Sequence, residues 1–116
     1  MLSEIIGLLD GAHSAFHAVK DISAMLDRAG FERLDESESW NVQKGGKYYV
    51  TRNLSSLIGF IVPRDGIKCM LFPASHCDSP VFKIKQNAEL EVRSSYIQLD
   101  TERYGGMILA SWLDRP

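Results

Sequence analysis

The sequence predicts an α/β fold in which a mixed sheet carries helices at its N-terminal end. Apolar residues recur at helical spacing up to Gly30. Beyond Gly30 the chain changes to short runs rich in β-branched and aromatic residues, separated by turn signals. The length of 116 residues suits one domain or a piece of one.

The clearest element is a helix from Ser14 to Ala29. Ser14 is a favoured N-cap residue, and Gly30 stands where a left-handed residue often ends a helix. One face of this helix carries the apolar residues Phe16, Val19, Ile22, Met25, Leu26 and Ala29. A shorter helix is expected over residues 2–10, whose apolar residues also share a face.

Strand-like runs follow the helices. In chain order they are 47–52, 56–62, 67–74, 81–85, a hairpin or a pair of ribbon strands over 90–103, and a last apolar run over 107–113. Ser56–Val62 and Ile67–Ala74 are apolar on both faces, which is typical of strands covered on both sides. No helix after Gly30 could supply the second cover, so we expect a domain that is cut short.

Composition excludes several classes of partner. A net charge of −2 gives no broad positive field for nucleic acid or for an anionic membrane. No apolar stretch approaches the ~20 residues that span a bilayer. Two cysteines make no disulfide framework, so a reducing, cytoplasmic location is expected.

The most informative motif directly follows an expected strand. His76 and Asp78 lie two residues apart, so in an extended backbone their side chains share a face. A carboxylate in this position can accept the free N–H of a metal-bound imidazole. The pattern equally fits a loop histidine with a nearby capping aspartate.

Weaker signals also suggest chemistry. His13 and His17 have the spacing of paired helix ligands but lack the glutamate of His-Glu-x-x-His, so capping or exposure fits them better. Ser75 or Ser79 beside the neighbouring histidine could open a serine triad, although sequence neighbours rarely hold that geometry. Cys77 could be a reactive thiol, but a spectator role fits it better.

Several motifs occur in an order that resembles the aspartyl aminopeptidase and aminopeptidase I family of zinc metallopeptidases. They are Ala15–Val19 (AFHAV), Ala29–Phe31 (AGF), Gly45–Asn53 (GGKYYVTRN), Ser55–Ile58 (SSLI), Ser75–Pro80 (SHCDSP), Tyr104–Gly106 (YGG) and Ser111–Arg115 (SWLDR). Together they cover nearly the whole chain. Such an ordered set is far more specific than any single motif.

The resemblance implies a set of site residues. His76 would be a zinc ligand, Asp78 would be the catalytic-site residue that orients it, and Asp114 would bridge two zinc ions. Cys77 stands where the family usually has threonine. Pro116 stands where many members have a second aspartate, which matters only if that later position were the ligand.

The resemblance also implies a function. The family members are hydrolases that remove acidic N-terminal residues from peptides and assemble as homo-oligomers. Residues 1–116 would form the first, N-terminal portion of a three-layer αβα catalytic domain. The dimerisation insert and the C-terminal half of that domain would be absent. The other site residues of the family, a Glu-Glu pair, a further aspartate and a final histidine, would then lie outside the chain. The chain alone should therefore bind zinc poorly and be inactive.

Two other interpretations stay open. The chain could be a non-catalytic truncated or regulatory interaction module that reuses this part of the family. Alternatively, a second chain could supply the missing half and restore a split enzyme.

Overall fold

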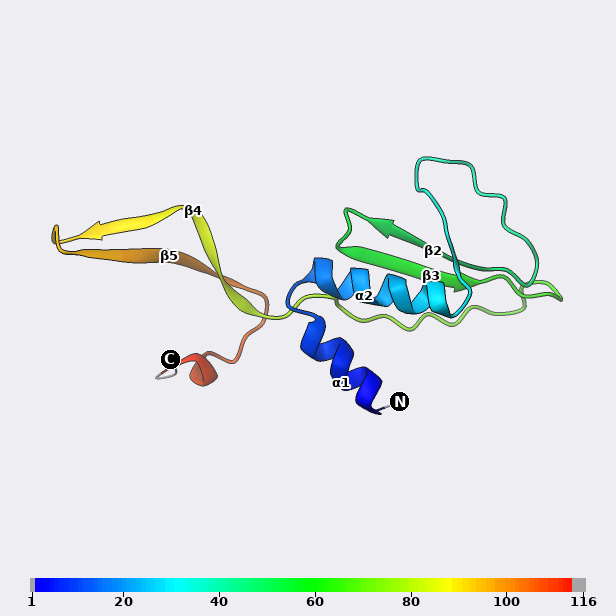
Figure 1. The fold of residues 1–116 in the computed structure, drawn as a ribbon, viewed down its shortest axis with the longest axis horizontal. Helices are drawn as coiled ribbons and strands as arrows, with labels where there is room; N and C mark the ends of the chain where they lie inside the picture. Colours follow the sequence, from blue (N-terminus) through cyan, green and yellow to red (C-terminus); the bar gives the residue numbers. More distant parts are fainter. Residues whose placement is uncertain (1, 114–116) are drawn as a thin grey trace. The chain divides into compact units, whose positions relative to one another are not determined.

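The computed structural model describes residues 2–113 and divides the chain into two compact units, which meet between Asp78 and Ser79 in the sequence. Figure 1 shows the helices and a sheet in the first unit and a long hairpin in the second. Each unit is described by itself.

Both expected helices are present in the first unit: α1 spans Leu2–Gly11 and α2 spans Ala15–Arg28. Ser14 caps α2, and its side chain accepts a hydrogen bond from the backbone N–H of His17. At the other end Gly30 has a φ of +77°, and the N–H of Phe31 reaches back 3.0 Å to the carbonyl of Leu26. The predicted start and end of this helix are therefore confirmed.

The first unit also contains a three-stranded sheet in the order β1-β2-β3. The strands are β1 (Glu32–Arg33), β2 (Lys47–Arg52) and β3 (Ser56–Ile61). Strand β1 runs parallel to β2, whereas β2 and β3 are antiparallel, so the sheet is mixed as predicted. Asn53 and Leu54 join β2 to β3 with φ values of 51° and 56°, a turn that matches the twist of a hairpin.

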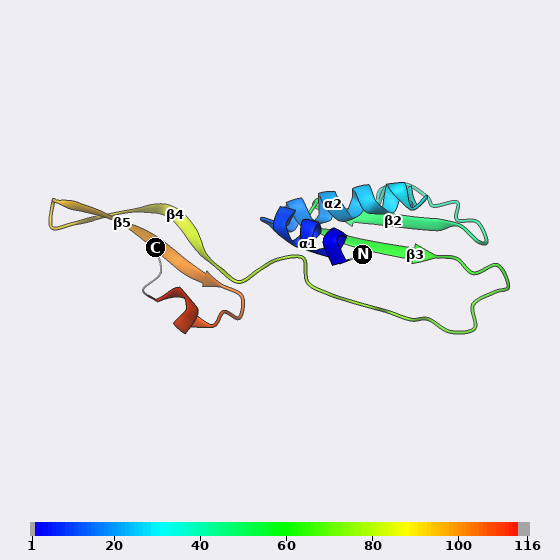
Figure 2. The same cartoon turned by 60° about the horizontal axis from the view of Figure 1, so that its bottom comes forward.

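The core of the first unit lies where α2 packs against the sheet, as Figure 2 shows. Ala18 and Val19 of α2 are buried, as are Tyr48 and Tyr49 of β2. The Tyr49 hydroxyl donates a hydrogen bond of 2.8 Å to the Asp27 carboxylate of α2. This hydrogen bond and the buried side chains fix the register of helix and strand.

Neighbouring residues of a strand point to opposite faces, so Tyr48 faces away from α2. Its ring lies 5.6 Å from that of Phe60, and the Phe60 ring stacks in turn with Trp40 at 6.2 Å. The Tyr48 hydroxyl accepts the backbone N–H of Gln43. The loop before β2 therefore gives the second face of the sheet part of its cover.

Two predictions for this unit need correction. Residues 56–62 were predicted to be a strand buried on both faces, and the strand exists, but Ile58 and Ile61 remain 67% and 60% exposed. Residues 67–74 were predicted to be a third strand, and they form none. The reason is that an apolar run becomes a strand only beside a pairing partner, and no described strand lies hydrogen-bonded along it.

The second unit is an antiparallel hairpin of β4 (Val81–Val92) and β5 (Tyr96–Tyr104), followed by a short 3₁₀ helix, η1 (Leu109–Trp112). The sequence predicted a strand over 81–85 apart from a hairpin over 90–103. These are one ribbon, because β4 continues through an irregularity between Ile84 and Glu89. The expected final apolar run is thus partly helical.

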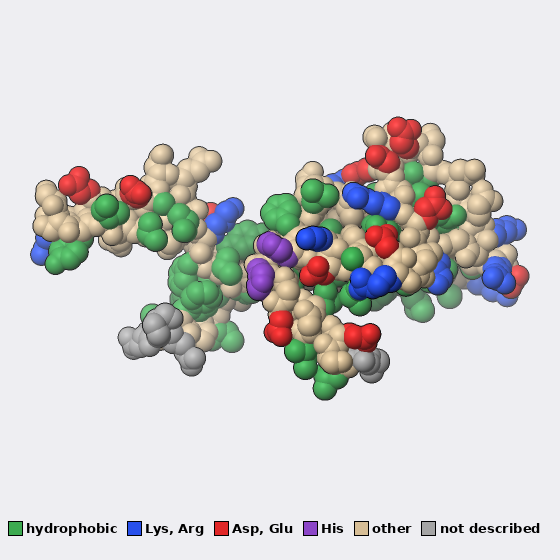
Figure 3. All heavy atoms as spheres, viewed as in Figure 1, with side chains coloured by type: hydrophobic (Ala, Val, Ile, Leu, Met, Phe, Trp, Pro, Cys, Tyr) green, Lys and Arg blue, Asp and Glu red, His purple; other side chains and the backbone are tan. Residues whose placement is uncertain are grey.

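Several contacts hold this ribbon together. Lys85 and Asp100 form an ion pair of 3.0 Å beside the irregularity in β4. The Trp112 ring packs edge-on against Phe82 at 5.2 Å, which attaches η1 to the hairpin. Many hydrophobic side chains nevertheless remain on the surface of the hairpin, as Figure 3 shows. Within residues 2–113, none of the helices has the length and apolar character needed to cross a membrane.

Replacing Tyr49 by phenylalanine tests the core of the first unit. The change removes the hydrogen bond to Asp27, so we expect a loss of about 1 kcal/mol in the free energy of unfolding at pH 7. Burial, followed by the bond to Asp27, raises the pKa of Tyr49. The unfolded chain therefore ionises first, and the stability that Tyr49 contributes is lost as the pH rises from about 10 through the folded-state pKa.

Urea unfolding at pH 7 and across this alkaline range measures both effects. Tyr49→Phe should reduce the alkaline loss of stability, whereas the control Tyr96→Phe changes a side chain that is 72% exposed and should leave it unchanged. An identical alkaline slope in wild type and Tyr49→Phe would contradict this description of the core.

Candidate metal centre

The predicted metal-site histidine lies near the end of the segment that follows β3. The turn at Pro63–Gly66 reverses the chain, and Gly66 adopts a φ of +86° there. Residues 67–78 then follow an extended course without regular secondary structure, which Figure 2 shows between β3 and β4. Within the described part of the chain, residues 67–78 make no backbone–backbone hydrogen bond.

His76 is exposed, with 78% of its side chain open to solvent, and its ring is held from one side. Its Nδ1 lies 2.6 Å from the main-chain carbonyl oxygen of Asp78. Because a carbonyl can only accept, Nδ1 must carry the hydrogen and donate it. This arrangement leaves the Nε2 lone pair of a neutral imidazole free, in the form that binds a metal ion.

The Asp78 carboxylate contributes more weakly to the same contact. Its Oδ1 lies 3.4 Å from His76 Nδ1, farther than the main-chain oxygen. The carboxylate is 41% exposed, so a small side-chain rotation could bring it closer to the ring or turn it toward solvent. The structure therefore brings His76 and Asp78 together. The main-chain oxygen of Asp78, and not its carboxylate, makes the shorter contact with His76 Nδ1.

The remaining predicted ligand, Asp114, lies outside the described residues. Among residues 2–113, no cluster of three His, Cys, Asp or Glu side chains could hold a metal ion. Zinc in a catalytic site takes about three protein ligands. The donor chemistry at His76 fits zinc, since a neutral imidazole with a carbonyl behind it is a common ligand arrangement, but it supplies only one ligand.

The weaker sequence signals have local explanations in the structure. The rings of His13 and His17 meet edge-on at 5.7 Å, and His17 Nδ1 is 2.9 Å from the hydroxyl of Ser14 at the start of α2. These contacts fit helix capping. Cys77 is half-buried and Cys69 is exposed, and both are free thiols.

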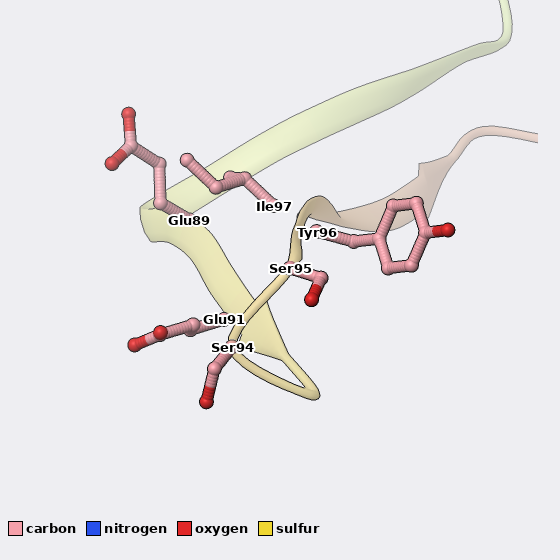
Figure 4. A pocket seen from close by; sticks show the side chains of 6 residues that line it. All are labelled: Glu89, Glu91, Ser94, Ser95, Tyr96 and Ile97. Atoms are coloured by element: carbon pink, nitrogen blue, oxygen red, sulfur yellow. The ribbon is translucent and has the colours of Figure 1, made fainter.

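Two hollows in the structure have no counterpart among the sequence predictions. A groove of about 460 Å³ lies between α2 and the sheet, and its lining includes Lys20, Asp27, Arg33 and Tyr49. A shallower hollow at the tip of the hairpin is shown in Figure 4. It is lined by Glu89, Glu91, Ser94, Ser95, Tyr96 and Ile97. Among the described residues, neither His76 nor Asp78 lines either hollow. Periodicity gives no signal for a groove built from distant elements.

The His76 tautomer is directly testable. We expect nitrogen-15 NMR of the neutral imidazole, recorded at about pH 8.5, to show hydrogen on Nδ1 and a bare Nε2. Because the shorter contact is to a main-chain oxygen, Asp78→Asn should keep this tautomer. Hydrogen on Nε2 in the wild-type chain, or a tautomer that reverses in Asp78→Asn, would contradict the described geometry.

The profile of the family described as Aminopeptidase I zinc metalloprotease (M18) matches residues 8–116. The match therefore covers the first unit from residue 8 onward, with the segment that carries His76, and the whole of the second unit.

Curated relatives match over nearly the whole chain. A protein of Clostridium novyi described as "Probable M18 family aminopeptidase 2" is 44% identical over 98% of the chain and 27% of its own length. A protein of Clostridium acetobutylicum with the same description is 42% identical over 97% of the chain and 27% of its own length. The chain thus spans about a quarter of the length of these relatives.

Solved structures show the same relationship. The "Cryo-EM structure of the Ape4 and Nbr1 complex" includes a chain that is 29% identical, with a TM-score of 0.80 over 97% of this chain and 22% of that one. The "Structure of S. cerevesiae mApe1 dodecamer" matches with 27% identity and a TM-score of 0.74 over 97% of this chain and 27% of that one.

The family profile covers most of the sequence, and the fold agrees with these solved structures. The predicted resemblance and the predicted α/β class are both confirmed. This chain belongs to the M18 family of aminopeptidase I zinc metalloproteases.

Proposed function

We propose that this chain contributes to a zinc-dependent aminopeptidase site, in which His76 is a metal ligand. The observation that supports this role most strongly is the ring of His76, whose Nδ1 is engaged by the Asp78 carbonyl while Nε2 remains available. An exposed imidazole held in one tautomer is prepared to bind a cation. Membership of a zinc metalloprotease family supplies the matching chemistry.

Asp78 has a positioning role in this proposal. Its main-chain oxygen accepts the Nδ1 hydrogen at 2.6 Å, and its carboxylate at 3.4 Å can strengthen that contact. Partners of this kind fix the direction of the ring and increase its basicity. Zinc, when bound, would provide Lewis acidity toward the carbonyl of a peptide substrate.

The remaining parts of the proposal come from the resemblance. Asp114 would bridge two zinc ions, and the substrate would be a peptide with an acidic N-terminal residue. The complete protein would act in the cytoplasm as a homo-oligomer, in line with the dodecamer described for yeast mApe1. The chain would provide the N-terminal portion of the catalytic domain.

A second candidate function is a non-catalytic interaction module. The observation in its favour is that residues 2–113 contain no group of three metal-binding side chains. A site with a single histidine ligand holds zinc weakly, since catalytic zinc takes about three protein ligands. The two candidate functions differ in one respect: in the first, further polypeptide supplies the missing metal ligands and completes a catalytic site around His76, and in the second it does not.

The chain by itself should bind zinc weakly and should not hydrolyse a dipeptide with an N-terminal aspartate. Isothermal titration of the purified chain with zinc, followed by a hydrolysis assay, measures both properties. Tight stoichiometric binding with turnover would show that the 116 residues form a complete site, contrary to the proposal.

A second experiment adds the rest of the family sequence. We would co-express the chain with the portion of the Clostridium novyi relative that it does not match and assay the co-purified complex with zinc. We expect cleavage of N-terminal Asp and Glu in preference to Leu. His76→Ala should abolish hydrolysis. Asp78→Ala keeps the main-chain oxygen that contacts Nδ1 and loses only the carboxylate, so it should reduce zinc affinity by about tenfold or less.

His13→Ala is the matched control, because His13 is an exposed imidazole whose ring packs edge-on against His17 in the first turn of α2. It should leave both zinc affinity and hydrolysis unchanged. Asp114→Ala, tested separately, examines the second predicted ligand. Full activity in His76→Ala would exclude the proposed ligand role, and an inactive wild-type complex that still assembles would favour the interaction module.

A further inference from the structure

We propose that the groove between α2 and the sheet binds a small monocarboxylate that carries an apolar group, the chemistry that an N-acylated leucine presents. The groove has a volume of about 460 Å³, within the range of about 300–1,000 Å³ that is typical of small-molecule sites. The inference does not rest on the proposed function, because neither His76 nor Asp78 lines this groove.

The groove has one wall from the helix and one from the sheet. The helical wall is a single face of α2, because its lining residues recur at helical spacing: Phe16, Lys20 and Asp27. The sheet and its turn supply the other wall with Arg33, Tyr49 and Leu54. Figure 1 shows α2 and β2 running in opposite directions, so the start of the helix lies beside the end of the strand. Phe16 and Leu54 therefore mark one end of the groove, and Asp27 and Tyr49 mark the other.

Two positive charges line the groove between its ends. Lys20 comes from α2 and Arg33 comes from β1, and among residues 2–113 neither side chain forms an ion pair. Arg33 Nη2 donates a hydrogen bond of 3.0 Å to the neutral hydroxyl of Thr51, which leaves other N–H groups of the guanidinium available. A carboxylate accepts strong, charge-assisted hydrogen bonds from both kinds of cation.

Asp27 limits the charge of the ligand. Its Oδ1 accepts the hydroxyl hydrogen of Tyr49 at 2.8 Å, which keeps this carboxylate at the base of the groove. With His17 counted as neutral, the charged lining residues are Lys20, Arg33 and Asp27, so two positive charges and one negative charge leave one net positive charge. A monocarboxylate balances that charge, whereas a phosphate dianion would exceed it and would be repelled more strongly by Asp27.

The end of the groove away from Asp27 is apolar. Phe16 is 59% exposed and Leu54 is 61% exposed, so an apolar group placed against them would remove hydrophobic surface from water. Phe16 precedes Asp27 by eleven residues, which is about 16 Å along the helix. The ligand would therefore place its apolar group against Phe16 and Leu54, with its carboxylate toward the cations.

An NMR titration of the nitrogen-15-labelled full chain with N-acetyl-L-leucine tests this inference. We expect the backbone signals of the groove residues to shift in a saturable way, with a dissociation constant of about 1 mM or tighter. N-acetyl-L-leucinamide lacks the negative charge and acetate lacks the apolar group. Each of these two probes should bind at least about tenfold more weakly than N-acetyl-L-leucine.

Substitutions identify the residues that hold each part of the ligand. Lys20→Gln and Arg33→Gln each remove one cation and should weaken binding of N-acetyl-L-leucine by about fivefold or more. The matched control Arg28→Gln removes an exposed cation from the last turn of the same helix, outside the groove lining, and should leave binding unchanged. Leu54→Ser should weaken binding, whereas Ile58→Ser changes an exposed residue of β3 outside the lining and should not.

Three results would overturn the inference. The first is the absence of a saturable shift at the groove in the wild-type chain. The second is equal affinity for N-acetyl-L-leucine and its amide, because the cations would then contribute nothing. The third is binding that survives both Lys20→Gln and Arg33→Gln, or that falls as much in Arg28→Gln. Signals outside the groove that keep their wild-type positions show that each variant is folded.

Discussion

The packing of α2 against β2 is the constraint on which the first unit depends. Ala18 and Val19 on the helix and Tyr48 and Tyr49 on the strand are its buried hydrophobic residues. The Tyr49–Asp27 hydrogen bond satisfies the polar group that burial would otherwise penalise. This small core holds β2 and β3 in register, and β3 in turn leads into the segment that carries His76.

Local sequence signals predicted the elements that local contacts can stabilise. Ser14 and Gly30 correctly marked the limits of α2, because a cap and a left-handed residue act within one turn. Residues 67–74 have an equally strong strand pattern and form no strand. A strand needs a partner for its backbone, and whether that partner is present depends on contacts that no local pattern reports.

The geometry of the candidate site could likewise be predicted only between residues that are close in the sequence. The spacing of His76 and Asp78 suggested that they lie together, and they do, since residues that are two apart in the sequence are close in space. The spacing did not reveal that the main-chain oxygen of Asp78 makes the shorter contact, because every residue type has the same main-chain carbonyl. Asp114 depends on the resemblance alone, and sequence spacing over dozens of residues fixes no distance.

We propose that His76 binds zinc through Nε2 while its Nδ1 hydrogen stays on the Asp78 carbonyl. Nitrogen-15 NMR of this chain, labelled at histidine and assembled with the unmatched portion of the Clostridium novyi relative, measures both nitrogens as zinc is added. We expect a large shift of the His76 Nε2 signal, with Nδ1 still protonated. Stoichiometric zinc binding that leaves the His76 Nε2 signal unmoved would contradict it.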